Sequence, residues 1–108
     1  MKEVVELFRQ KGLIFKELEE VDLKRLGIRK RLQAYLGVDL SNRYHLLFLI
    51  RRKSRFLRKD ATDLVLLVEQ LERAFSHKVA KKSLFLEAPL CSKAKELLLE
   101  RGFRVFTL

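Results

Sequence analysis

The feature that most limits how this chain can fold is the segment Tyr44–Ile50, which reads YHLLFLI and is apolar on both of its alternating faces. A strand with one side in water alternates apolar and polar residues, whereas a strand covered on both sides does not. We therefore predict a central strand here. The rest of the chain has to supply a layer on each side of it.

The residues after this strand alternate between helix and strand patterns. Asp60 is a good helix N-cap, and apolar residues at helical spacing follow it: Leu64, Leu67, Val68, Leu71 and Phe75. A strand is predicted at about 83–87, a helix at about 92–101 and a last strand at 103–107. Such alternation implies parallel strands joined by right-handed crossovers. We expect an α/β fold with a small three-stranded, mainly parallel sheet (strands about 44–50, 83–87 and 103–107) and helices on both faces.

The N-terminal part, residues 1–40, is predicted to be helical. Residues 2–11 place their apolar side chains on one side, and Gly12 can end that helix. Residues 13–18 fit either a short strand or the start of a helix running to about residue 26, and we favour the helix because strict alternation never develops. Gly27 then separates a second short helix at about 29–36. No linker rich in Pro, Gly or Ser interrupts the chain, so residues 1–108 are expected to form a single domain.

The charge of the chain indicates a class of partner. Its 108 residues carry a formal net charge of +10, more than a small domain needs for solubility, which favours attraction to a polyanion: nucleic acid, acidic lipid or an acidic protein surface. No stretch is apolar for the roughly 18 residues that a membrane span requires, and MKEVVELFRQ lacks the apolar core of a signal peptide. We expect a cytoplasmic protein with no membrane span.

Positive charge is densest directly after the predicted central strand. Six of the nine residues from 51 to 59 are basic: Arg51, Arg52, Lys53, Arg55, Arg58 and Lys59. Strand-to-helix junctions of a parallel sheet share one edge, where ligands of open α/β sheets bind. The second junction leads into Ser92 and Lys93, so this basic loop, with Ser54, and the helix start at Ser92 are predicted to hold phosphate groups together.

A second basic cluster, with Arg29, Lys30 and Arg31, is predicted as a further contact. The surrounding stretch Asp22–Leu36 locally resembles a DNA-binding helix-turn-helix, and loosely also the SAM interaction domain. Phe56, inside the basic loop, has two interpretations: a ring that stacks on an unpaired base, or an anchor that fixes the loop to the core.

Residues that could carry covalent or metal chemistry are few. The thiol of Cys91, the one cysteine, is expected to have a lowered pKa at a helix N-terminus, although a buried structural cysteine is the preferred interpretation. His45 and His77 are far apart in sequence and lack partners at metal-ligand spacing, so no metal site is predicted. Neither GxxxxGK[ST] nor GxGxxG occurs, so we expect no nucleotide cofactor.

These observations predict a non-enzymatic nucleic-acid-binding domain, for RNA or DNA, with phosphates held at the carboxyl edge of the sheet. The alternative is a protein-interaction or homo-oligomeric domain whose basic face meets an acidic partner, and whose strand at 103–107 pairs with a second copy. A minor alternative is a metal-dependent nuclease, for which Glu87, Asp60 and Asp63 are the nearest approach to a carboxylate site.

Overall fold

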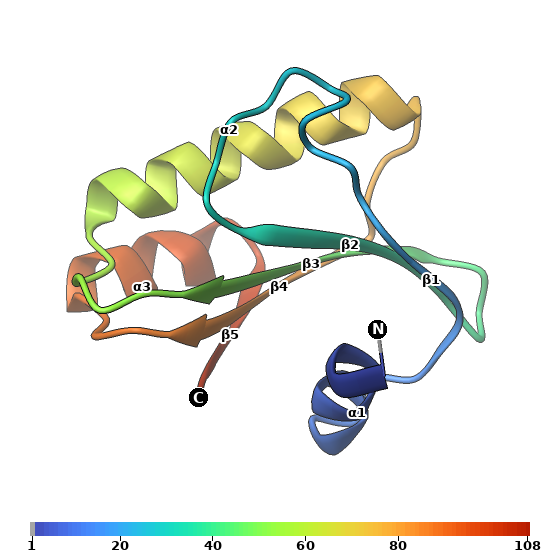
Figure 1. Cartoon of the computed structure of the whole chain (residues 1–108), viewed down its shortest axis with the longest axis horizontal. Helices are drawn as coiled ribbons and strands as arrows, with labels where there is room; N and C mark the ends of the chain where they lie inside the picture. The colour runs from blue at the N-terminus through green and yellow to red at the C-terminus, as the bar shows by residue number, and fades with distance from the viewer. Residues whose placement is uncertain (1) are drawn as a thin grey trace.

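The computed structural model describes residues 2–108, which form five strands and three helices (Figure 1). In chain order they are α1 (Lys2–Gln10), β1 (Phe15–Glu20), β2 (Gln33–Asp39), β3 (Tyr44–Arg51), α2 (Arg58–Phe75), β4 (Lys81–Glu87), α3 (Ser92–Glu100) and β5 (Phe103–Thr107). No helix among these described residues is long and apolar enough to cross a membrane.

The strands form one sheet in the order β1-β2-β3-β4-β5. β1, β2 and β3 make an antiparallel meander, whereas β4 and β5 both run parallel to β3. β3 is the middle strand, and its residues 45–50 are all buried, as its apolar faces predicted. The α/β class is thus confirmed. The prediction of a three-stranded, mainly parallel sheet is wrong, because two antiparallel strands extend it.

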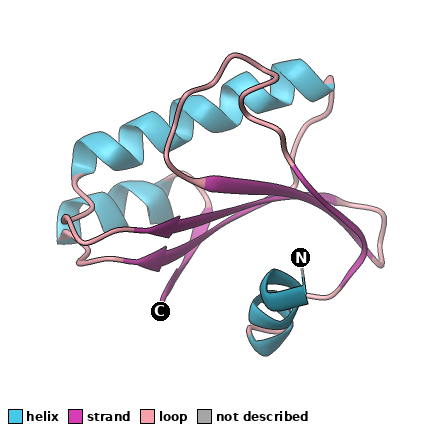
Figure 2. Ribbon diagram, viewed as in Figure 1, coloured by secondary structure: helices cyan, strands magenta, loops and turns pink. Residues whose placement is uncertain are grey.

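Helices cover both faces of the sheet, and the two helices that follow β3 and β4 lie together on one of these faces. α2 and α3 lie on the same face, and α1 covers the other (Figure 2). The chain crosses over from β3 to β4 and then from β4 to β5, and moves in the same direction along the sheet each time. Because both crossovers have the same handedness, their two helices lie on the same face of the sheet. Phe48 belongs to the core under α2 and α3, while Leu49 packs with Phe8 of α1.

The helix predicted from residue 13 to about 26 is wrong, because β1 occupies its first half. The pairing of β1 with β2 shifts register between Phe15 and Glu17, which marks a β-bulge. With one residue extra, the partly buried side chains fall at Phe15 and Leu18, three positions apart. This spacing mimics a helical period, so the expected alternation is absent from the sequence.

The helix predicted at 29–36 is also wrong, since β2 begins at Gln33. Gly37, within β2, is a packing residue: a Cβ at this position would lie 2.8 Å from Cδ1 of the Phe15 ring.

The likeness of residues 22–36 to a helix-turn-helix does not hold in the structure. Residues 23–27 make one isolated turn, in which the N–H of Ile28 donates to the carbonyl of Leu23 at 2.9 Å. Leu23 and Ile28 are buried with Val21 in the core under α2. The apolar spacing that suggested helices therefore belongs to buried residues that fix the connection between β1 and β2 to the core. This connection arches over the α2 side of the sheet in Figure 1.

Candidate nucleic-acid interface

The basic loop follows the end of β3 and is fixed to the next strand-to-helix junction. The N–H of Arg52 donates to the carbonyl of Glu87 at 3.0 Å, which continues the ladder between β3 and β4. Further on, the N–H of Phe56 donates to the carbonyl of Pro89 at 2.8 Å. The carbonyl of Phe56 accepts from the N–H of Cys91 at 3.0 Å. The loop therefore runs beside the start of α3, and the two junctions share one edge of the sheet, as a parallel arrangement requires.

Phe56 is the anchor of this loop, so of its two interpretations the base-stacking ring does not fit the structure. Its side chain is 1% exposed and belongs to the core under α2 and α3. The guanidinium carbon of Arg52 lies 5.2 Å from the centre of its ring, on the outer side. A buried ring cannot stack on a base unless the loop first detaches from the core.

Arg52 serves the protein's own structure. Its Nη2 atom donates to Oδ2 of Asp60 at 2.6 Å and to the carbonyl of Arg55 at 3.0 Å. Asp60 also accepts from the N–H of Leu57 at 2.7 Å, so it caps α2 from inside its first turn rather than from the position before it. Partial burial acts to raise the pKa of Asp60, but the hydrogen bonds from Arg52 and Leu57 outweigh it and hold that pKa below its ordinary value.

Arg51 lies on the opposite face of β3 and is far more accessible. Its Nε atom is 3.3 Å from Oε2 of Glu87, and the two side chains are 56% and 60% exposed. Exposed pairs of this kind contribute about 0–1 kcal/mol. An incoming phosphate can therefore replace Glu87 at little cost.

Arg51 also lines a hollow of about 470 Å³ on the α1 side of the sheet, with Glu20, Gln33 and Tyr35 on its walls. Burial raises the pKa of Tyr35, the charge of Glu20 raises it further, and the charge of Arg51 opposes them. Both charges are thus close to the phenol. This hollow was not predicted, because Glu20 and Gln33 were assigned to helical segments.

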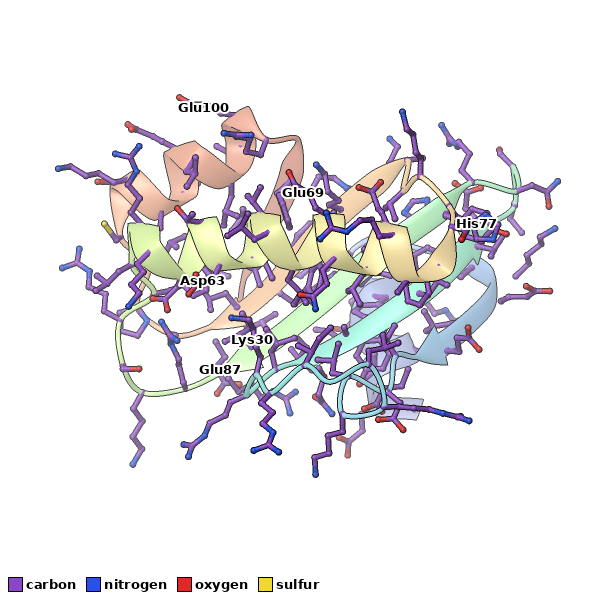
Figure 3. The ribbon with its side chains drawn as sticks, turned by 90° about the horizontal axis from the view of Figure 1, so that it is seen from above. Lys30, Asp63, Glu69, His77, Glu87 and Glu100 are labelled. Atoms are coloured by element: carbon purple, nitrogen blue, oxygen red, sulfur yellow. The ribbon has the colours of Figure 1, made fainter. Side chains whose placement is uncertain are left out.

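The two basic clusters, which are about twenty residues apart in sequence, meet in space. A cavity of about 480 Å³ on the α2 side is lined by both, and by the first turns of α2: Arg29, Lys30, Arg31, Leu32, Ile50, Arg51, Arg52, Ser54, Phe56, Asp60, Asp63 and Leu64. Figure 3 labels two of these residues, Lys30 and Asp63. Segment 29–31 is brought here by the buried anchors Leu23 and Ile28, not by helix geometry.

Most cations at this edge have no carboxylate partner among the described side chains. No ion pair within 4.0 Å involves the exposed residues Arg29, Lys30, Arg31, Lys53, Arg55, Arg58, Lys59 and Lys93. We refer to these eight residues, with Arg51, as the cationic edge. Its charges are available to an external anion.

Helix α3 starts at this edge, with Cys91 as its N-cap and Ser92 as its first residue. The backbone N–H groups of Ala94 and Lys93, which face the Cys91 thiol, lower its pKa, and the charge of Arg55 adds to them. The lowering follows the expected direction, but the part played by Arg55 was not foreseen. Cys91 is half-buried rather than fully buried.

The two histidines lie away from the cationic edge. His45 is 5% exposed, and its Nε2 atom is 2.8 Å from Oδ2 of Asp39. His77, just beyond the end of α2, stacks on Tyr44 with ring centres 4.5 Å apart.

The acidic residues that the sequence offered for a metal do not converge. Among the described side chains, no group of three or more His, Cys, Asp or Glu residues could hold a metal ion. Asp60 is bound to Arg52, and Glu87 is paired with Arg51.

No protein-family model matches this chain, and no curated protein is significantly similar to it in sequence. Solved structures do match. EndoMS in its apo form has a TM-score of 0.60 and 25% identity, over 99% of this chain and 45% of that chain. A complex of EndoMS with double-stranded DNA gives 0.56 and 23%, over 99% and 43%. A repair endonuclease from Pyrococcus abyssi gives 0.58 and 20%, over 98% and 45%.

These similarities correct the functional prediction. A non-enzymatic domain was expected, but the solved neighbours are EndoMS and a repair endonuclease, which contradicts a prediction that excludes a nuclease. The nucleic-acid part of the prediction agrees with these neighbours, one of which was solved with double-stranded DNA. The chain spans less than half the length of each neighbour.

Proposed function

We propose that this chain is a double-stranded-DNA-binding domain of the endonuclease class, which holds the sugar–phosphate backbone along the cationic edge and takes part in its cleavage. The observation that carries the proposal is the similarity to EndoMS, which extends over 99% of this chain at 25% identity. The net charge of +10 and its concentration at one edge support it.

The proposed contacts come from three segments. Residues 29–31 line one cavity with Arg51, Arg52, Ser54 and Phe56 of the 51–59 loop, while Ser92 and Lys93 begin α3, which starts beside this loop. Contacts of this kind position a DNA duplex without reading its sequence. If about five phosphates are engaged, the logarithm of affinity should fall with the logarithm of salt concentration at a slope of about −4 to −5.

A pair of matched double variants tests the contact surface. Arg55→Ser with Arg58→Ser removes two charges from the cationic edge, whereas Lys78→Ser with Lys81→Ser removes two exposed charges at or before the start of β4, the opposite end of the strands. Fluorescence anisotropy with a 30-base-pair duplex should show the slope shallower by about 2 for the first variant only. Equal slopes for both variants would refute the placement of the interface.

Cleavage is tested on plasmid and on perfect and mismatched duplexes, with Mg²⁺ or Mn²⁺ supplied. Nicking or double-strand cutting by the full chain supports the enzymatic part of the proposal. The same binding and cleavage assays with single-stranded DNA and with RNA show which nucleic acid the chain prefers. A chain that neither binds nor cuts any of them refutes the proposal.

We further propose a homodimer formed through β5. Among the described strands β5 has β4 as its one neighbour, so its outer backbone groups are free to pair with a second copy. Light scattering at several concentrations should show twice the monomer mass. We also propose a cytoplasmic location, which imaging of a fluorescent fusion would check.

A further inference from the structure

Phosphodiester cleavage in many nucleases depends on divalent cations that carboxylates hold between the attacking and leaving oxygens. The carboxylates at the carboxyl edge of β3 do not fit such a site. Asp60 accepts from Arg52 at 2.6 Å and from the N–H of Leu57, and Glu87 lies 3.3 Å from the Nε atom of Arg51. Among the described side chains, no group of three or more His, Cys, Asp or Glu residues is placed to hold a metal ion.

Arginine side chains are the partners of both carboxylates at this edge. Arg51 ends β3 and Arg52 follows it directly, and their two side chains lie toward opposite faces of the sheet. Arg51 lines both hollows, the one with Glu20 on the α1 side and the one with Arg29–Arg31 on the α2 side. A guanidinium group donates two parallel hydrogen bonds to a phosphate and needs no metal to bridge them.

We propose that Arg51 binds a DNA phosphate directly at this edge, in place of a divalent cation held by this chain's carboxylates. The inference rests on the proposed function, since the phosphate is that of bound DNA. Glu87 is the resting partner of Arg51 and gives way to the phosphate. A cation that serves cleavage therefore takes its ligands from residues other than the carboxylates of this edge.

Arg43 provides a matched control for Arg51. Its Nε atom is 3.2 Å from Oδ2 of Asp39, and its side chain is 55% exposed, close to the values for Arg51. It lies next to the other end of β3, far from the cationic edge. We expect Arg51→Gln to weaken binding of a 30-base-pair duplex about tenfold, whereas Arg43→Gln changes it by less than about twofold.

Arg51→Lys keeps the positive charge but loses the paired hydrogen bonds of the guanidinium group. Glu20→Gln tests whether a carboxylate in the hollow holds a metal ion. The lysine variant should bind DNA with an affinity between those of the wild type and Arg51→Gln. Glu20→Gln removes a negative charge from the hollow, so it should bind DNA as well as the wild type or more tightly. Weaker binding by Glu20→Gln in Mg²⁺ would instead indicate a carboxylate that holds a cation.

The direct measurement uses Mn²⁺. At constant ionic strength, duplex affinity in EDTA should equal or exceed that in Mg²⁺, and the electron paramagnetic resonance signal of free Mn²⁺ should persist when the full chain is added. Loss of that signal at about one Mn²⁺ per chain, or duplex binding that requires Mn²⁺, overturns the inference and leaves the proposed function standing. Absence of duplex binding in every buffer rejects the proposed function itself.

Discussion

Replacement of Phe56 distinguishes a ring that anchors the basic loop from a ring that stacks on bases. The side chain is 1% exposed, so Phe56→Ala empties a packed site and should lower the free energy of unfolding by about 3–5 kcal/mol. For a domain of this size that loss lowers Tm by roughly 15 °C or more. Chemical denaturation followed by circular dichroism measures it.

Phe56→Leu separates stability from DNA contact. It removes three buried carbon groups at roughly 0.8 kcal/mol each, a loss of about 2 kcal/mol, and should leave the protein folded at 10 °C. Its affinity for DNA at that temperature should match the wild type, because the backbone bonds from Phe56 to Pro89 and Cys91 remain. A stacking ring would instead contribute about 1–3 kcal/mol per base.

Two results would refute this account of Phe56. One is a free energy of unfolding for Phe56→Ala within about 1 kcal/mol of the wild type. The other is a folded Phe56→Leu protein that loses more than about fivefold in affinity for single-stranded DNA.

Three further predictions follow from the same contacts. Asp60 has a lowered pKa, so its contribution of about 1–2 kcal/mol to the free energy of unfolding is present near neutral pH and is lost as the pH falls below about 4. In urea titrations Asp60→Asn should therefore be less stable than the wild type at pH 7, and the two proteins should be equally stable at pH 2. Cys91 lies at the cationic edge with a lowered thiol pKa, so bound duplex should slow its alkylation by iodoacetamide, and an unchanged rate at saturating DNA would count against contact near α3. Gly37→Ala should cost about 1–3 kcal/mol because a Cβ would lie 2.8 Å from the Phe15 ring, and Phe15→Leu in the same chain should restore part of that loss.

The part of the fold that local pattern encodes was predicted well. β3, α2, β4, α3 and β5 lie within a few residues of the expected ranges, because each has a run of apolar residues at one period and ends at a turn or cap. β1 and β2 were missed. A bulge at Phe15 and a strand apolar on both faces at 33–39 remove the alternation by which strands are recognised.

The candidate site was predictable as far as topology reached. Parallel strands place their carboxyl ends at one edge, so the basic loop was expected beside the start of α3, where the bonds between Phe56 and Cys91 hold it. The meeting of this loop with Arg29–Arg31 was not expected. It depends on buried Leu23 and Ile28, whose spacing suggested helices instead.

The central strand, the alternating second half and the strong positive charge follow from neighbouring residues and from composition, so they could be read from the order of amino acids alone. Which cations are paired and which are available depends on the folded arrangement. Arg51 and Arg52 are adjacent in sequence, yet one meets exposed Glu87 and the other is bound to Asp60. Such differences arise from contacts between residues that are distant in the chain, because successive side chains of a strand point to opposite faces of the sheet.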